Sequence, residues 1–169
     1  INVPITYFTD ILCALRFRDW DRSNFYEPYK KQIQKTILAG HDVQLHLHPH
    51  WIDSTWEDGK FKPSKAYGLG AFKNRQPPND ISGIVKQGAD LLKEICSEAN
   101  SNYKCIAYRA GGYNFSPCTE DILEALYANG IRIDSSVAKD FCFASNISKV
   151  NYRQMPKAAN WTIPLSGPL

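Results

Sequence analysis

The sequence lacks several features that would place it at once in a functional class. No apolar run approaches the roughly 18 to 20 residues of a membrane-spanning helix, so we expect no membrane span. The five cysteines form no C-x-x-C pair, and an odd number cannot all pair within one chain. The 20 Lys and Arg residues barely outnumber the 17 Asp and Glu residues, without the basic stripe of a nucleic-acid surface. Nucleic acid is therefore not an expected partner.

The cysteines indicate the expected cellular compartment, and the chain ends indicate the expected extent of the domain. The cysteines are Cys13, Cys96, Cys105, Cys118 and Cys142. We expect free, mostly buried thiols in a reducing compartment, which favours a cytoplasmic location. The sequence opens at Ile1 almost directly in a strand-like run and stops abruptly at Leu169. We therefore expect one domain over residues 1–169, truncated at both ends, and no pattern predicts its oligomeric state.

Strand-like and helix-like segments alternate along the chain. The predicted strands are Val3–Thr9, Asp42–Leu47, Lys104–Tyr108, Ile131–Asp134 and Trp161–Leu165. The predicted helices run from about Glu27 to a Gly40 cap, over Ile81–Ile95 after an Asn79 or Asp80 cap, and from Ser116-Pro117 to Asn129-Gly130. Such repeated β-α units indicate an α/β fold with parallel strands, in an open sheet or a barrel.

One connection, residues 51–78, is much longer than the others and contains several aromatic and basic residues. Its aromatic content argues against disorder. It is either a lid packed on the domain or a wall that contacts a substrate.

Polar residues follow three of the predicted strands. His46, His48 and His50 follow the second strand, Arg109–Asn114 the third, and Asp134–Ser136 the fourth. In both α/β arrangements the chemistry gathers at the C-terminal ends of the strands. These three clusters are therefore the candidate functional residues.

All four histidines of the chain, including His41, lie within ten residues. Side chains alternate along a strand, so His46 and His48 face the same way until Pro49 ends the strand. If the chain then turns helically, His46 and His50 converge instead, and both pairings remain open. A histidine is often a hydrogen-bonded structural residue, the role we expect for His41, but a cluster of this kind favours metal binding.

A hydrolytic metal site usually adds a carboxylate to its histidines. The candidates are Asp10, Asp42, Asp53 and Asp134, and their spacing does not choose among them. In YRAGGYN, Arg109 is placed to clamp a carboxylate, and Gly111-Gly112 lets backbone amides approach a ligand as oxyanion donors. The alternative for this stretch is a glycine turn beside an exposed arginine.

These residues together resemble the polysaccharide deacetylases, the NodB-homology domain of carbohydrate esterase family 4. GHDVQLHLHPH resembles the family's histidine motif, which implies that His46 and His50 are metal ligands. YRAGGYN resembles its R-x-P-Y motif, which implies that Arg109 holds a catalytic aspartate and that the Tyr113 amide receives the oxyanion. VPITYFTD, GIRIDSS and NWTIPLS resemble other strands of the family. The implied fold is a distorted (β/α) barrel of about seven strands.

The resemblance implies a metal-dependent hydrolase that removes an N- or O-acetyl group from an acetylated sugar or glycan precursor. The implied cofactor is a divalent ion, zinc in the first place, with cobalt or nickel as alternatives. We expect His48, Trp51 and Asp134 to contact the substrate.

The sequence also departs from the family pattern. Gly111 replaces the usual proline and Leu47 the usual Ser or Thr, and His48 is an additional histidine. The family's aspartate pair and its L-x-H motif would lie beyond the two ends, so we expect the segment alone to be inactive. Two alternatives remain: a non-catalytic relative that binds a glycan or a partner, and a metal-dependent hydrolase of cyclic amides or imides.

Overall fold

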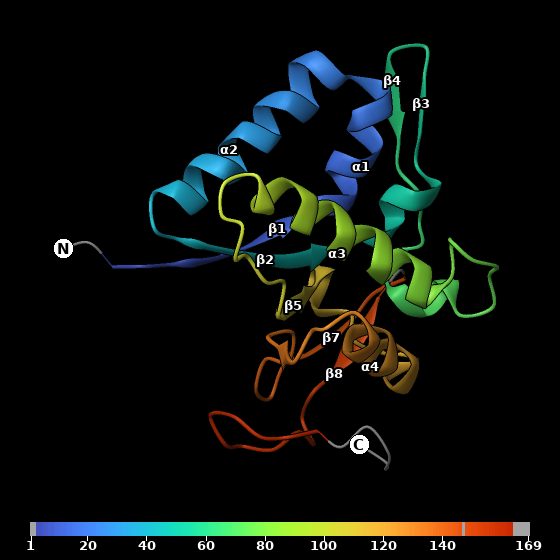
Figure 1. Ribbon diagram of the computed structural model, residues 1–169. Helices are drawn as coiled ribbons and strands as arrows, with labels where there is room; N and C mark the ends of the chain where they lie inside the picture. Colours follow the sequence, from blue (N-terminus) through green and yellow to red (C-terminus); the bar gives the residue numbers. More distant parts are fainter. Residues whose placement is uncertain (1–2, 147, 164–169) are drawn as a thin grey trace.

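The chain forms an α/β structure around one parallel sheet (Figure 1). The computed structural model describes residues 3–146 and 148–163. The sheet has the strand order β1-β2-β5-β6, with β1 (Thr6–Asp10), β2 (Asp42–Leu47), β5 (Ala107–Ala110) and β6 (Ile133–Asp134) all parallel. The predicted α/β class is thus confirmed. The described residues form an open four-stranded sheet and do not close into a barrel.

Four α-helices accompany the sheet: α1 (Ile11–Trp20), α2 (Glu27–Leu38), α3 (Ile81–Ser97) and α4 (Thr119–Ala128). The longest of them, α3, packs against the other three helices and against β2. Figure 1 shows α1, α2 and α3 gathered on one side of the sheet, with α4 beside its other end. None of the helices in the described ranges is long and apolar enough to cross a membrane.

Shorter elements fill the connections. They are the π-helix η1 (Arg22–Tyr26), the 3-10 helices η2 (Pro49–Asp53), η3 (Leu69–Phe72) and η4 (Gly111–Tyr113), and the strands β3 (Thr55–Glu57), β4 (Lys60–Lys62), β7 (Cys142–Ala144) and β8 (Lys149–Asn151). β3 pairs with β4, and β7 with β8, as antiparallel hairpins. The connection of residues 51–78 is therefore partly ordered by its own hairpin. Residues 161–163 do not form the predicted last strand, and the remainder of that prediction lies outside the described residues.

The strand and helix signals in the core explain why β2 and α3 form where predicted. Val43, Leu45 and Leu47 alternate along β2 and are buried beneath α3. The Asp80 side chain caps α3 by accepting a hydrogen bond from the Gly83 amide at 2.9 Å. Gly88 lets α3 approach β2 closely, because a Cβ there would lie 2.6 Å from Leu47 Cδ2. The packing of α3 on β2 fixes the orientation of the strand that holds the histidines.

β5 begins three residues later than the predicted strand, and the side chain of Gln44 explains the difference. Gln44 is buried in β2, and its Oε1 accepts hydrogen bonds from the amides of Ile106 and Ala107 at 2.9 and 2.8 Å. Its Nε2 donates to the carbonyl of Lys104 at 3.1 Å. The side chain thus takes the place of the strand ladder over residues 104–106, and backbone pairing with β2 starts at Tyr108.

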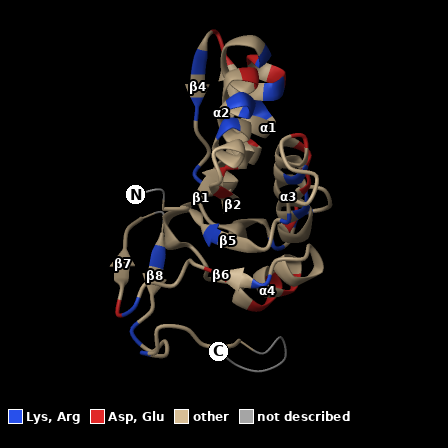
Figure 2. Cartoon of the chain, turned by 60° about the vertical axis from the view of Figure 1, so that its left-hand side comes forward, with Lys and Arg blue, Asp and Glu red and all other residues tan. Residues whose placement is uncertain are grey.

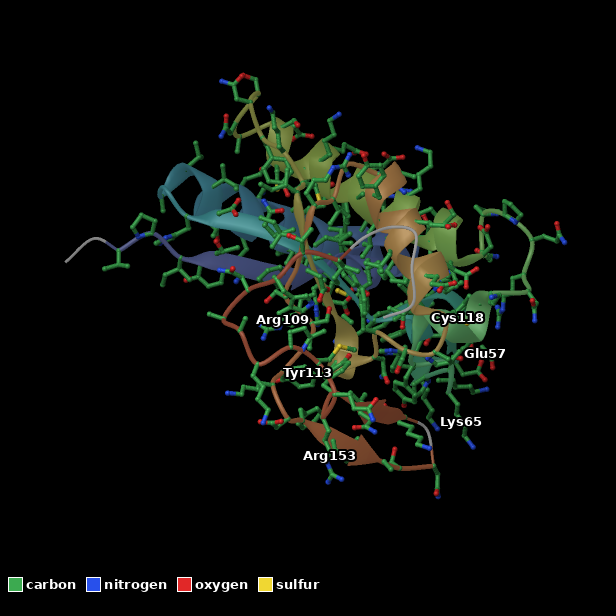
Figure 3. All side chains as sticks on the ribbon, turned by 90° about the horizontal axis from the view of Figure 1, so that it is seen from below. Glu57, Lys65, Arg109, Tyr113, Cys118 and Arg153 are labelled. Carbon is green, nitrogen blue, oxygen red and sulfur yellow. The ribbon has the colours of Figure 1, made fainter. Side chains whose placement is uncertain are left out.

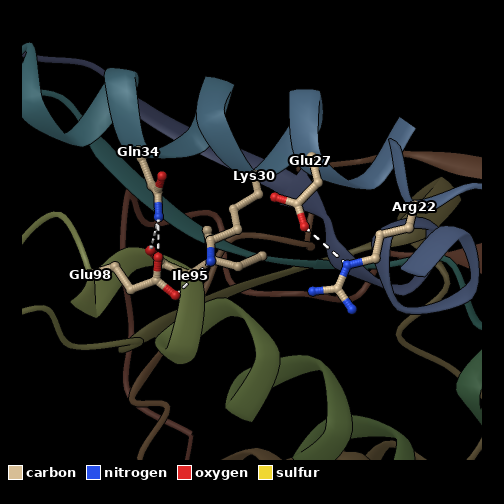
Figure 4. Close-up of polar contacts among 6 residues, drawn as sticks. All are labelled: Arg22, Glu27, Lys30, Gln34, Ile95 and Glu98. Carbon is tan, nitrogen blue, oxygen red and sulfur yellow. Dashed lines mark hydrogen bonds and ion pairs between the residues drawn. The ribbon is translucent and has the colours of Figure 1, made fainter. Parts of the chain in front are cut away.

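Polar contacts join α2 to α3 at the surface (Figure 4). Lys30 Nζ lies 2.6 Å from Glu98 Oε1, and Gln34 Nε2 donates to Glu98 Oε2 at 2.8 Å. A surface ion pair of this kind contributes at most about 1 kcal/mol, so the apolar face of α3 dominates the stability here. Figure 2 shows acidic and basic residues interspersed on α2 and α3.

Candidate metal centre

The C-terminal ends of three neighbouring strands bring candidate residues side by side. In the sheet register, Asp10 at the end of β1 pairs with His46 in β2, and His46 pairs with Arg109 in β5. Laterally paired residues of a parallel sheet point to the same face. The three side chains therefore belong to one face at the edge where α/β proteins place their chemistry.

His46 and His48 are in direct contact. Their Nε2 atoms lie 3.0 Å apart, and His46 Nδ1 lies 2.8 Å from the carbonyl oxygen of Arg109. A carbonyl only accepts, so Nδ1 of His46 holds the proton and its Nε2 presents a lone pair. Burial lowers the pKa of both imidazoles, which keeps them in the neutral form that binds metals. Of the two pairings that the sequence leaves open, the described geometry contains that of His46 with His48.

His50 lies beyond His48 as seen from His46. Its ring centroid is 5.6 Å from that of His48, and its ring packs between Trp51 and Tyr67 at centroid distances of 5.2 and 5.1 Å. Its Nδ1 is buried without a hydrogen-bond partner in the described part of the chain. Burial lowers the pKa of His50 as well. His50 is therefore a neutral imidazole with a free nitrogen near the pair, but not in contact with His46.

Asp10 is the carboxylate that lies beside the histidines. Its Oδ1 accepts a hydrogen bond from the His48 amide at 3.3 Å, and its Oδ2 accepts one from Trp51 Nε1 at 2.7 Å. Burial raises the pKa of Asp10 to about 6, although the Trp51 hydrogen bond opposes the shift. The Tyr29 hydroxyl donates to the Asp10 carbonyl at 2.8 Å, which helps to fix the strand end.

The other three candidate carboxylates lie elsewhere. Asp42 is at the opposite end of β2, where its Oδ1 accepts from Gln44 Nε2 at 3.0 Å. Asp53 forms a two-pronged ion pair with Arg75, with both N–O distances 2.7 Å. Asp134 accepts hydrogen bonds from the hydroxyl and the amide of Ser136 at 2.5 and 2.9 Å, and burial raises its pKa.

Arg109, Tyr113 and Asp134 line a cavity of about 960 Å³ between α4, β6 and residues 159–163. Figure 3 shows Arg109 and Tyr113 near each other, away from Glu57 and Lys65 of the 51–78 connection. The Arg109 guanidinium also lies 5.7 Å from the ring centre of Phe8 on β1. The predicted site residues thus form two groups, the histidines with Trp51 and the cavity residues, and the backbone of Arg109 connects them.

Gly111 and His48 lie next to each other in space, although they are far apart in the sequence. A Cβ at Gly111 would lie 2.7 Å from His48 Nδ1 and 2.6 Å from the Leu47 carbonyl oxygen. Any residue other than glycine, including the proline of the resembled motif, would displace the imidazole or the strand end. The strand end and the His48 ring together therefore require glycine at this position.

Tyr113 is held in a constrained loop. Both Gly112 and Tyr113 have positive φ values, 58° and 59°, and such a conformation is uncommon for tyrosine. The Tyr152 hydroxyl donates to the Tyr113 carbonyl, and the Tyr113 ring packs against Phe141 at 5.0 Å. The segment around the β7–β8 hairpin therefore fixes the loop that follows Arg109.

His41 makes contacts typical of a structural residue. Its Nδ1 accepts a hydrogen bond from the Ile5 amide at 3.3 Å, and its ring meets Tyr7 edge to face at 5.7 Å. These contacts tie the start of β2 to β1, at the opposite end of the strand from the histidine pair.

The fit of this cluster to a metal ion is partial. His46 and His48 supply two neutral nitrogens at adjacent positions, and this donor set suits zinc, cobalt or nickel. Within the described ranges, no group of three His, Cys, Asp or Glu side chains is arranged to hold a metal. Asp10 is the nearest candidate for a third ligand, but both of its oxygens accept hydrogen bonds from the protein. The described residues thus provide two adjacent imidazoles and a neighbouring carboxylate, without a complete set of metal ligands.

No protein-family model, curated protein or solved structure matches this chain.

Proposed function

We propose that the protein is a metal-dependent hydrolase that removes an N- or O-acetyl group from a sugar or glycan precursor. The observation that supports this proposal most strongly is the contact between His46 Nε2 and His48 Nε2, at the strand edge beside Asp10 and Arg109. With the His46 proton on Nδ1, His48 Nε2 donates the hydrogen bond between the two rings; moving the His48 proton to its Nδ1 would turn both Nε2 lone pairs toward one cation.

A divalent ion, with zinc the first choice, would be held by His46 together with His48 or His50. When bound, such an ion polarises an acyl carbonyl and lowers the pKa of a water molecule. The motif resemblance assigns the second ligand to His50, whereas the geometry favours His48. The Arg109 carbonyl orients His46 by fixing its tautomer, a role that outer-shell acceptors have at many metal sites.

The remaining residues have proposed roles in substrate handling. Asp10, with its pKa raised to about 6, is suited to hold or release a proton near neutral pH. Arg109 positions a carboxylate, and the Tyr113 amide donates to the oxyanion. The cavity beside Arg109, Tyr113 and Asp134 has space for a sugar unit.

The barrel of about seven strands belongs to the same proposal. Both outer strands of the described sheet leave large apolar side chains open to solvent, with Tyr7 of β1 and Ile133 of β6 45% and 52% exposed. Further strands added along β1 and β6 would cover these side chains. Such strands would also be the source of the third ligand.

A second candidate is a glycan-binding relative without catalytic activity. It is favoured by the engaged oxygens of Asp10 and by the lack of a three-ligand group in the described ranges. The two candidates differ in whether acetate is released.

The test is a metal-dependent acetate-release assay on the complete natural protein. N-acetylglucosamine oligomers and acetylated xylan oligomers are the substrates, with a cyclic imide as the competing substrate class. We expect release that a chelator abolishes and zinc restores, and no release by His46→Ala. The His48→Ala variant should lose more activity than His50→Ala, and His41→Ala should behave as the wild type. Acetate release that persists without metal would overturn the proposal.

A further inference from the structure

Six aromatic side chains form a connected surface that leads away from the histidines. This surface, called the aromatic strip below, consists of Phe17 and Trp20 of α1, Phe25 of η1, Trp51 of η2, Trp56 of β3 and Phe61 of β4. The ring centroids of Trp51 and Phe61 are 4.9 Å apart, and those of Trp20 and Trp56 are 6.1 Å apart. Figure 1 shows the β3–β4 hairpin standing beside α1, which is the arrangement that these contacts maintain.

The strip is not an ordinary part of the core. None of its six side chains is fully buried, and Trp56 and Phe61 are 43% and 37% exposed. All six residues of the β3 and β4 strands are exposed. Exposing a contiguous aromatic surface to water is unfavourable. A protein that exposes such a surface at one place typically uses it for binding.

Trp51 connects the strip to the candidate metal centre. Its Nε1 donates to Asp10 Oδ2 at 2.7 Å, while its ring packs against His50 on one side and Phe61 on another. A chain-like molecule with one unit at His46 and His48 would therefore meet Phe61 and Trp56 with its next units.

The chemistry of the strip favours an uncharged ligand with flat apolar faces. In the β3–β4 hairpin the Lys62 ammonium is paired with Glu57, and on α1 the Arg16 guanidinium lies 4.7 Å over the Trp20 ring. These two cations are already engaged by neighbouring groups of the protein, and the other two charges of the hairpin, on Asp58 and Lys60, are opposite in sign. A pyranose ring presents C–H groups on its faces, which stack on indole and phenyl rings, and hydroxyls at its edges, which stay in water.

We propose that the aromatic strip binds the second and further units of an uncharged acetylated oligosaccharide whose acetylated unit lies at His46 and His48. This inference rests on the proposed function and extends it from a single sugar to a chain of at least three or four units. Trp51 positions the unit next to the metal centre, and Phe61 and Trp56 bind the units beyond it.

The experiment compares ligands of different length in the presence of a chelator, so that no turnover occurs. The complete protein is titrated calorimetrically with N-acetylglucosamine and its tetramer, and with acetylated xylose and acetylated xylotetraose. We expect at least one tetramer to bind about tenfold more tightly than its monomer, as two added stacking contacts would give. The Trp56→Ala/Phe61→Ala variant should bind that tetramer only as tightly as the monomer.

Two controls keep the result interpretable. Phe143→Ala removes an aromatic side chain of similar exposure, 48%, from the other hairpin and should leave binding unchanged. Trp56→Ala alone, checked by circular dichroism and urea unfolding, covers the case in which the double variant fails to fold.

Equal affinity for monomer and tetramer of both sugars would overturn the inference. The inference would also be overturned if the protein bound no glycan and the strip instead mediated self-association or binding to neutral lipid vesicles. In that case the double variant would lose the self-association or the vesicle binding. Tetramer binding without acetate release would refute the proposed hydrolase and leave the strip assigned.

Discussion

Asp10 has an unusual position for a carboxylate, between two hydrogen-bond donors and largely away from water. Burial raises its pKa to about 6, whereas the unfolded chain would titrate near 3.8. Because the folded pKa is the higher one, the stability linked to this group is present below about pH 4 and is lost as the pH rises through about 6. A buried aspartate that weakens the fold at neutral pH is typical of a functional site.

We therefore predict that Asp10→Asn changes the pH dependence of stability. In metal-free protein, the free energy of unfolding of the variant relative to the wild type should rise by about 2 to 3 kcal/mol between about pH 4 and pH 7. The asparagine amide cannot match both donors, so the absolute offset between the two proteins is less informative than its slope. Urea unfolding across this range measures the difference, and a pH-independent difference would show that Asp10 titrates normally.

The sequence names Asp10 only as one of four candidate carboxylates, because no local spacing relates it to the histidines. What selects it is the register of β1 against β2, which places Asp10 beside His46, 36 positions further along the chain. For His48, the alternation of side chains along the strand predicts only that it shares a face with His46. That His46 meets His48 and not His50 could not be predicted, because the room for the His48 ring is left by Gly111, a residue of the distant β5 loop.

At the scale of elements, the contact between β2 and the loop after β5 decides the geometry of the histidines. Gly111 is a point of close approach, since it faces both the Leu47 carbonyl and the His48 ring. Its backbone is not in the left-handed region, so an alanine there is excluded by neighbouring atoms and not by its own conformation.

Gly111→Ala should therefore displace His48. We predict zinc binding weakened by at least about tenfold, an effect typical of disturbed metal-site support. We also expect a loss of about 1 to 3 kcal/mol in unfolding free energy from the overpacked strand end. Calorimetric zinc titration and urea unfolding measure the two effects. Gly68→Ala is the matched control, because its new Cβ would lie at an ordinary 3.4 Å from Asn114 Cβ. Wild-type zinc affinity in Gly111→Ala would contradict the role of His48.

Elements with strong local signals are the ones that the sequence predicts well. β2 has the predicted bounds, and α3 begins after its Asp80 cap. α1 is not predicted, because its buried residues lie together in its first turn and give no helical stripe. The β3–β4 and β7–β8 hairpins are not predicted either. Each of their strands has only three residues, and the positions of the hairpins depend on contacts with distant segments.

At the scale of the whole molecule, three features lie at or beside one edge of the sheet. The histidine pair lies at the ends of β1 and β2, the cavity of Arg109 and Tyr113 lies toward β6, and the aromatic strip leads away along α1. The parallel order of the strands could be predicted from the β-α alternation. The placement of these three features could not, because it depends on which strands are neighbours.

The most direct test of the proposed metal centre is an anomalous diffraction measurement at the zinc edge on zinc-soaked crystals of the complete protein. We predict one strong peak about 2.0 to 2.1 Å from Nε2 of both His46 and His48, the usual zinc–imidazole distance. A third ligand from outside the described residues, or a reoriented Asp10, should complete the site. A peak bound by His46 and His50 with His48 turned away would contradict the assignment of His48, and no peak at any of these nitrogens would contradict the metal centre itself.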